Sequence, residues 1–162
     1  AVLFTPEENL AREVAQEVAG QLKKLSRTAI MEKSLAQYGA IIITPDIDAA
    51  VELANVFAPE HLELMVENPT ALLEKVRNAG AVFLGSFTPE ALGDYTAGTN
   101  HILPTEGTAR FSSPLGVYDF MKRMSVLHFT QEALDRLGAK TAHFAAMEGL
   151  DAHAHSVKIR KA

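Results

Sequence analysis

The adjacent residues Glu60 and His61 have the side chains needed for proton transfer. An imidazole exchanges protons near neutral pH with only a small shift from a reference pKa of about 6.5. A neighbouring carboxylate can hold and activate a water molecule. The alternative interpretation is a solvated glutamate beside a capping histidine. The pair precedes a predicted strand, whereas ligands in open α/β sheets bind beyond the carboxyl ends of strands, so its position alone does not favour a site.

A second candidate site lies in the polar stretch 93–113, which follows neither a helical nor a strand period. Asp94 and His101 are ligand types that suit zinc or another divalent ion, although Asp94 can equally cap a turn after its glycine. Long loops in compact domains are usually functional or disordered, and Tyr95 and Phe111 argue against disorder because they give this loop something to bury. We therefore predict a site built on an irregular loop over these residues.

A third group of titratable residues follows a predicted helix that ends at Gly149. Glu148, Asp151, His153 and His155 can serve as metal ligands, and exposed surface polarity is the alternative. The chain has no cysteine, so a metal could bind only to His, Asp, Glu or Gln side chains, and no thiolate nucleophile is available. Together the three groups indicate a metal-assisted acid–base site but name no reaction.

The elements that must position these residues alternate between helices and short apolar strands. The β-branched run 40–44 and the apolar run 81–84 are typical of strands buried on both faces. Helical spacing and end signals predict helices over 5–25, with Thr5 as N-cap, over 28–38 and over 69–78. This alternation predicts an α/β fold with an incomplete, doubly wound and mainly parallel sheet.

The pattern changes near residue 114, where we place a domain boundary. Residues 1–114 form the α/β segment that carries the acid–base pair and the loop site. Residues 115–162 form a small helical C-terminal appendage, with a helix over 130–148. The tail 156–160 alternates in a way that predicts a terminal strand.

Composition excludes several classes of function. The 162 residues carry a net charge of −5, which argues against a nucleic-acid partner. No apolar run is long enough to span a bilayer and no signal peptide is recognisable, so no membrane association is expected and the predicted location is the cytoplasm. The ten glycines form no G-x-G-x-x-G or P-loop pattern. No dinucleotide-binding residue can therefore be assigned in this chain.

A series of longer motifs runs in order along nearly the whole chain. The segments are Ala58–Leu62, Ala79–Gly85, Thr88–Tyr95, Gly98–Thr105, Ser112–Ser113, Asp119–Arg123 and Glu148–His153. In this order they closely resemble the C-terminal portion of the histidinol dehydrogenase family, and motifs of this length and number are highly specific.

The resemblance implies NAD-dependent, zinc-dependent oxidation of L-histidinol through histidinaldehyde to L-histidine, in histidine biosynthesis. It implies that Glu60 is the base that activates water for the aldehyde step and that His61 is the base for the alcohol step. The aspartate of the Gly-Asp-Tyr motif implies a zinc ligand at Asp94. The terminal motif implies a second zinc ligand at His153. The implied substrate contacts are His61, Asp94, His101, Glu148 and His153.

The resemblance also implies that the site is incomplete in this chain. Family members take two further zinc ligands and most NAD contacts from sequence ahead of the matching portion, so we expect the isolated 162-residue chain to be inactive. They form homodimers that exchange the C-terminal appendage, which implies that Glu148 and His153 complete the partner's site. The alternative is a non-catalytic dimerisation or binding module that retains the fold.

Overall fold

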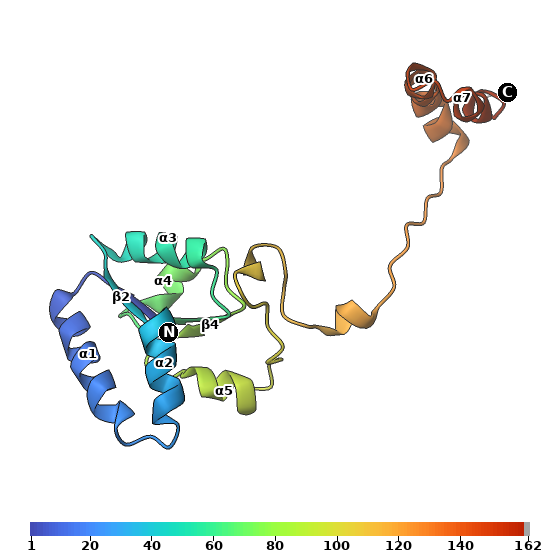
Figure 1. The fold of residues 1–162 in the computed structure, drawn as a ribbon. Helices are drawn as coiled ribbons and strands as arrows, with labels where there is room; N and C mark the ends of the chain where they lie inside the picture. The colour runs from blue at the N-terminus through green and yellow to red at the C-terminus, as the bar shows by residue number, and fades with distance from the viewer. Residues whose placement is uncertain (161–162) are drawn as a thin grey trace. The chain divides into compact units, whose positions relative to one another are not determined.

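The computed structural model of the chain describes residues 1–160, which fall into two compact units. The first unit is Ala1–Phe120, and the second begins at Met121. Short parallel strand pairs alternate with helices in the first unit, and the second unit is helical (Figure 1). The predicted α/β fold with parallel strands and a helical C-terminal part is therefore confirmed. The sequence-based boundary at residue 114 lies inside the first unit.

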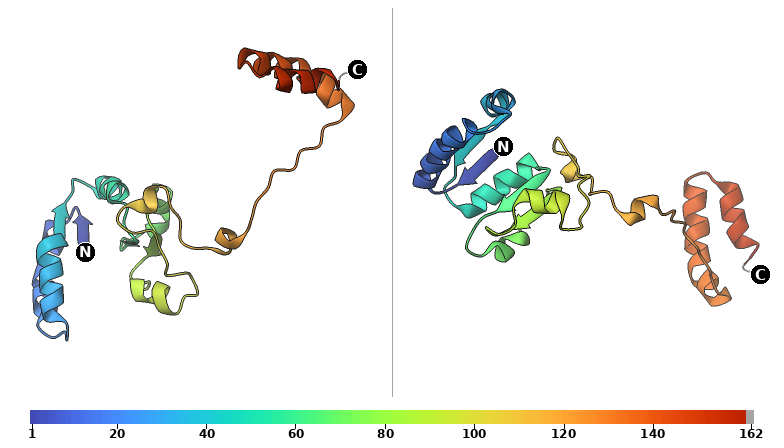
Figure 2. Two further views of the ribbon diagram at one scale, coloured as in Figure 1. Left: turned by 45° about the vertical axis from the view of Figure 1, so that its right-hand side comes forward. Right: turned by 90° about the horizontal axis from the view of Figure 1, so that it is seen from below.

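The first sheet pairs β1 (Val2–Thr5) with β2 (Ala40–Ile43) in parallel. Parallel strands need a crossover connection, and here it consists of α1 (Glu8–Leu22) and α2 (Thr28–Tyr38). Figures 1 and 2 show both helices along the same side of this sheet, where α1 contacts both strands. The hydroxyl of Thr5 accepts a hydrogen bond from the backbone N–H of Glu7 at 3.1 Å. Helix α1 thus has Glu7, not the predicted Thr5, at its N-cap.

The prediction that residues 40–44 are buried on both faces is wrong for the strand itself. Ile41, Ile42 and Ile43 keep 39%, 38% and 49% of their surface exposed. The physical reason is that, within residues 1–160, the main packing neighbours of β2 are β1 at its edge and the single helix α1, which leave much of the strand's surface uncovered. Thr44, directly after the strand, is buried at 4% exposure.

The second sheet pairs β3 (His61–Leu64) with β4 (Ala81–Leu84), also in parallel. The register places His61 opposite Ala81 and Leu64 opposite Leu84. Helix α3 (Ile47–Phe57) precedes β3, and α4 (Pro69–Leu73) lies in the connection between the two strands. Helix α3 begins at an N-cap aspartate, Asp46, whose side chain accepts a hydrogen bond from Ala49 N at 2.7 Å.

The connection before β4 is held by one buried amide. Asn55 on α3 is 2% exposed, and its Oδ1 accepts hydrogen bonds from the backbone N–H groups of Arg77 (2.7 Å) and Asn78 (3.2 Å). Its Nδ2 donates to Lys75 O at 2.9 Å. These bonds divert the backbone from a helical pattern, so α4 ends at Leu73 and the predicted helix over 69–78 is too long.

The stretch 93–113 is less irregular than predicted. Helix α5 (Glu90–Tyr95) extends into it after Pro89, and one 3₁₀ turn follows at η1 (Thr108–Arg110). A second 3₁₀ turn, η2 (Val117–Phe120), closes the first unit. The candidate ligand Asp94 therefore lies on a helix and not in a loop.

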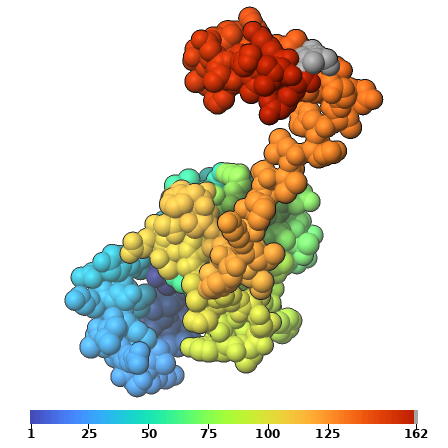
Figure 3. All heavy atoms as spheres, turned by 90° about the vertical axis from the view of Figure 1, so that its right-hand side faces the viewer, coloured from blue at the N-terminus to red at the C-terminus, as the bar shows by residue number. Residues whose placement is uncertain are grey.

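The second unit contains a pair of helices, α6 (Gln131–Met147) and α7 (Asp151–Lys158), which pack against one another. Figure 3 shows their atoms together in the orange-red to red part of the colour range. Their small core consists of Ala142, Ala145 and Ala154, with Val157 packed against it. The predicted strand over 156–160 is wrong, because Ala154 and Val157 stand three residues apart and face α6 as neighbours on one helix face. Among residues 1–160, no helix combines the length and apolar character needed to cross a bilayer.

Candidate active site

His61 is fixed at the start of β3 by backbone pairing that extends ahead of the strand. Ala81 N donates to Glu60 O at 2.8 Å, and Gly80 N donates to Pro59 O at 2.9 Å. A Cβ at Gly80 would lie 2.5 Å from Glu60 O, so this close backbone approach needs glycine. The backbone of the predicted acid–base pair is therefore held tightly against the neighbouring strand.

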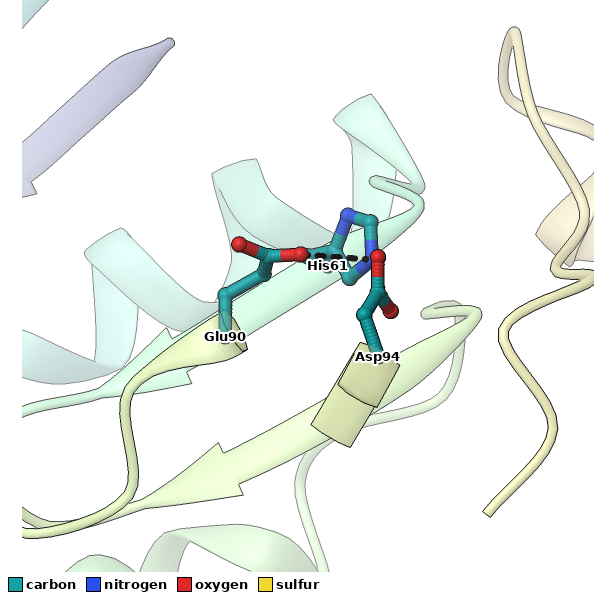
Figure 4. Close-up of side chains that lie close together, drawn as sticks. All are labelled: His61, Glu90 and Asp94. Atoms are coloured by element: carbon teal, nitrogen blue, oxygen red, sulfur yellow. Dashed lines mark hydrogen bonds and ion pairs between the residues drawn. The ribbon is translucent and has the colours of Figure 1, made fainter. Parts of the chain in front are cut away.

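Helix α5 presents two carboxylates to the ring of His61. Asp94 Oδ1 lies 3.4 Å and Glu90 Oε1 lies 3.7 Å from His61 Nε2. Residues four apart share one face of a helix, and Figure 4 shows both side chains directed at the imidazole from α5. The structure thus brings together His61 and Asp94, which the sequence had placed in separate candidate sites.

Helix α5 approaches the sheet closely because a glycine faces it. A Cβ at Gly93 would lie 2.5 Å from Cε1 and 2.9 Å from Cζ of Phe83, which is 6% exposed on β4. The Phe83 ring also contacts the His61 ring, with centroids 5.9 Å apart and an interplanar angle of 42°. One buried aromatic ring therefore touches both the helix that carries the carboxylates and the imidazole they face.

The three polar side chains are partly withdrawn from solvent. The exposed fractions are 25% for His61, 26% for Asp94 and 41% for Glu90. The pKa of Glu90 is raised above its usual value, first by a hydrogen bond with Asp94 and then by desolvation and the charge of Asp94, while the charge of His61 opposes the rise. The start of α5 is tied to β3, because Glu90 N donates to Glu63 Oε1 at 3.1 Å.

The same three residues form a donor set that suits a divalent cation. One ligand atom from each of His61, Glu90 and Asp94 lies within 4.8 Å of the others. An imidazole and carboxylates are common zinc ligands, and three protein ligands with an open position are typical of catalytic zinc. The cluster therefore places a carboxylate that suits a cation, Asp94, beside an imidazole that exchanges protons when it is not itself a ligand, His61.

The remaining predicted site residues of the first unit lie outside this cluster. Glu60 is half-buried, and its carbonyl takes part in the strand pairing described above. His101 is exposed in a segment without regular structure, beside Asn100, whose Oδ1 accepts from Ile102 N at 2.7 Å. The structure does not bring His101 to the His61 cluster.

The two predicted site residues of the second unit are on its surface. Glu148 is the C-cap of α6, and His153 lies in the first turns of α7; both are exposed. Gly149 between them has a φ of 73°, a left-handed conformation that ends α6. The two residues of the predicted zinc pair lie in different compact units, Asp94 in the first and His153 in the second. Their pairing at one zinc ion stays a prediction.

Sequence reasoning missed Glu90 as a member of the site. The signal that could have found it is the spacing Pro89-Glu90-x-x-x-Asp94, because proline favours a helix start and carboxylates four apart then share one face. Treating 93–113 as an irregular loop concealed this spacing.

Comparisons with known proteins match the whole of the described chain. The histidinol dehydrogenase family model matches residues 1–161. Among curated proteins, the histidinol dehydrogenase of Syntrophotalea carbinolica is 52% identical over 160 residues, and that of Aquifex aeolicus is 51% identical over 161 residues. Each match covers 99% of this chain but only 37% and 38% of the relative. The chain thus spans a little over a third of the length of these relatives.

A solved structure gives the same match in three dimensions. The crystal structure of histidinol dehydrogenase from Elizabethkingia anophelis superposes with a TM-score of 0.91 at 36% sequence identity. The superposition covers 98% of this chain and 36% of that protein.

Proposed function

Because this chain belongs to the histidinol dehydrogenase family, we propose that it supplies part of an active site that oxidises L-histidinol through histidinaldehyde to L-histidine with NAD. The observation that supports this proposal is the position of His61 Nε2, 3.4 Å from Asp94 Oδ1. A proton acceptor and a metal-ligating carboxylate at this separation can act on one substrate hydroxyl.

His61 and Glu60 divide the proton transfers between the two oxidation steps. His61 accepts the hydroxyl proton of the alcohol on its imidazole ring, which can carry that proton near neutral pH. Glu60 accepts a proton from the water that adds to the aldehyde. The backbone hydrogen bonds from Gly80 and Ala81 to the carbonyls of Pro59 and Glu60 hold the backbone beside both groups in place.

Asp94 is the zinc ligand that we assign within the first unit, and His153 is the ligand assigned in the second. When bound, a zinc ion supplies Lewis acidity that polarises a coordinated oxygen. Catalytic zinc usually has at least three protein ligands, and the chain covers 37% of its relative from Syntrophotalea carbinolica. We therefore propose that further ligands come from the rest of a family-length polypeptide.

Substrate and partner contacts follow the same proposal. His101, Glu148 and His153 bind L-histidinol together with His61 and Asp94. The appendage from residue 115 onward is exchanged in a homodimer, so that Glu148 and His153 serve the partner's site. No residue of this chain is assigned to NAD, since the sequence offers no phosphate-binding pattern. We place the protein in the cytoplasm, with neither nucleic acid nor membrane as a partner.

The test compares the 162-residue chain with a family-length polypeptide that contains the same residues. Histidinol-dependent NADH formation is measured with added zinc. We expect turnover from the long polypeptide, none from the chain alone, and a fall of about 100-fold or more in kcat for His61→Asn in the long form. Normal turnover by the chain alone, or an unchanged kcat for His61→Asn, would contradict the proposal.

A binding measurement separates this proposal from a non-catalytic module. Zinc added at 100 times its Kd should stabilise the family-length polypeptide by about 2.7 kcal/mol if the metal-binding residues are functional. Asp94→Ala should abolish this stabilisation, with Asp119→Ala as the control for loss of an aspartate elsewhere in the first unit. A pure dimerisation module would show no zinc-dependent shift in either protein.

A further inference from the structure

The turn that leads from α3 to Glu60 and His61 begins with a strained residue. Ala58, the C-cap of α3, has φ 52° and ψ 63°, a left-handed conformation that is uncommon for a residue other than glycine. The proline that follows it favours an extended conformation instead. Such a backbone persists only where the surrounding structure enforces it, and it recurs at active sites. The contacts that hold Ala58 therefore also hold the start of the acid–base pair.

One of these contacts comes from a distant arginine. The last carbonyls of a helix have no partner within the helix. In α3, Ala54 O accepts from the N–H of Ala58 at 2.8 Å. Val56 O, two residues before the strained position, accepts from Nη2 of Arg110, 54 positions later in the chain. The positive charge also suits the negative end of the helix dipole. Arg110 thus ties η1 to the end of α3.

The Arg110 side chain is held in this direction by its own turn. Its Nη1 donates to Gly107 O at 2.8 Å. Gly107 has φ 78°, and a Cβ on it would collide with Nη1 of Arg110. Glycine therefore supplies both the left-handed backbone and the space that the guanidinium occupies.

The segment that carries Arg110 contacts the acid–base turn at a second point. Pro104 is buried, and its Cδ lies 3.2 Å from the position that a Cβ on Gly80 would take. Gly80 N donates in turn to Pro59 O at 2.9 Å. Residues 104–110 thus restrain the turn at the end of α3 and also through the residue that precedes β4.

We propose that Arg110 is a positioning residue for Glu60 and His61. By binding Val56 O it holds the end of α3, and with it the left-handed backbone of Ala58, in the conformation that directs the pair into the site. This inference rests on the proposed function for its kinetic consequence, because a base acts only within hydrogen-bond reach of the proton it accepts. Its structural part, the restraint on the turn, does not depend on any activity.

The structural part is tested by amide hydrogen exchange in the 162-residue chain. Arg110→Ala should speed exchange by about 3- to 10-fold at Ala58, Gly80 and Ala81, because local opening of the turn becomes more frequent. The N–H groups of these three residues bond to Ala54 O or to the carbonyls of the turn itself. Exchange at Thr44, whose N–H bonds to the other sheet, should not change.

Two matched controls separate the guanidinium contact from other effects. Arg12→Ala removes an exposed arginine that bonds to its neighbours on α1, and it should leave exchange at the turn unchanged. Gly107→Ala should displace the guanidinium and reproduce the effect of Arg110→Ala. Gly98→Ala should not, although Gly98 has a similar φ of 85°, because a Cβ there meets nothing within 4 Å.

Two results would overturn the structural part. One is unchanged exchange at Ala58, Gly80 and Ala81 in Arg110→Ala. The other is an equal acceleration at Thr44, which would mean a general loss of stability and no specific restraint. Arg110→Met keeps the apolar stem without the donors, and it replaces Arg110→Ala if the latter unfolds.

The functional part is tested by kinetics in the family-length polypeptide. Arg110→Ala should lower kcat for histidinol by about 5- to 50-fold, because a small displacement of a catalytic group slows the chemical step. KM should change by less than about 3-fold and the bound zinc should not change, since no ligand or substrate contact is removed. Arg110→Lys keeps a charge and a donor and should recover part of the rate, and Arg12→Ala is the control.

The kinetic outcomes distinguish this inference from the proposed function. An unchanged kcat in Arg110→Ala, a loss of zinc, or a rise in KM alone would overturn the positioning role. Absence of turnover in the unmodified family-length enzyme would contradict the proposed function, and the restraint on the turn would still be decided by hydrogen exchange.

Discussion

Glu90 and Asp94 place two carboxylates one helical turn apart, and their proximity disfavours the charged state of both together. The pKa of Glu90 is raised mainly because it shares a hydrogen bond with Asp94, with desolvation and the negative charge of Asp94 adding to the effect. Like charges held on one face of a helix destabilise the folded state. A bound cation would remove this repulsion, so the arrangement favours function over the stability of the metal-free chain.

The raised pKa of Glu90 predicts a pH-dependent effect of Glu90→Gln. Since the folded state binds this proton more tightly than the unfolded state, the stabilisation is present at pH below the unfolded pKa and is lost as pH rises through the folded pKa. Without metal, Glu90→Gln should therefore match the unmodified chain near pH 4 and have the higher melting temperature near pH 7. Thermal unfolding between about pH 4 and pH 8 measures this difference.

Glu52 supplies a control of opposite sign. Its pKa is lowered by the hydrogen bond from Arg77, whose Nη2 lies 2.7 Å from Glu52 Oε2. The stabilisation from this group is present above the unfolded pKa and is lost as pH falls through the folded pKa. Glu52→Gln should therefore lower the melting temperature at pH 7 and lose its effect on acidification. The same sign for both variants would contradict the electrostatic explanation.

At the scale of elements, the close contact between α5 and β4 sets the distance between the carboxylates and His61. A methyl group at Gly93 would meet Phe83 at 2.5 Å, and Phe83 has little room to move because it is buried. We expect Gly93→Ala to lower the free energy of unfolding by about 1–3 kcal/mol through overpacking. It should also weaken zinc binding, measured by calorimetry.

Gly20 is the matched control for this substitution. It lies inside α1, and a Cβ there would meet nothing within 4 Å. Gly20→Ala should therefore raise the free energy of unfolding by about 0.5–1 kcal/mol, because alanine is the better helix former. Zinc affinity should not change. A loss of zinc affinity in both variants would show that the effect is not specific to the contact between Gly93 and Phe83.

Elements with local end signals were predictable from the sequence. The helix over 28–38 and the strand over 81–84 have the predicted bounds, since Gly39 ends the one and an uninterrupted apolar run defines the other. The errors arise where a distant residue decides the structure. Asn55, on α3, binds the backbone that follows α4, and α4 ends early. The alternating tail over 156–160 begins inside α7, where Val157 packs against the core shared with α6.

The sequence predicted which residues belong to the candidate site better than it predicted how they are arranged in space. His61 and Asp94 were both singled out by side-chain chemistry, but 33 positions separate them. Their proximity depends on the β3–β4 register and on the approach of α5 over Gly93, neither of which follows from local sequence. The role of Glu90 was missed for the same reason, because it depends on recognising α5 as a helix.

At the scale of the whole molecule, exposed apolar surface is the dominant feature. Besides the isoleucines of β2, large side chains with more than three quarters of their surface exposed include Phe87, Tyr95, Phe111 and Phe120. Such surface on a folded chain usually marks a site of contact with other protein. Since the chain spans about 37% of its relatives, we expect a family-length dimer to cover much of it.

If this surface is covered in a family-length protein, a mutation on it should change the free energy of unfolding more there than in the 162-residue chain. Ile41 and Ile43 lie on one face of β2, with 39% and 49% of their surface exposed. In the 162-residue chain, Ile41→Thr and Ile43→Thr should each change the free energy of unfolding by about 1 kcal/mol or less. In a family-length polypeptide that buries this face, each should cost about 2 kcal/mol or more, because a hydroxyl replaces a buried ethyl group.

Denaturant unfolding of both forms measures these differences, and Ile30→Thr on α2 tests whether any exposed isoleucine behaves in the same way. Ile30 is 67% exposed on a helix with no buried residue. Equal, small effects of the β2 substitutions in both forms would mean that the face of β2 stays open to solvent in the longer protein. A larger effect confined to the longer form would show that the face of β2 is covered by protein outside these 162 residues.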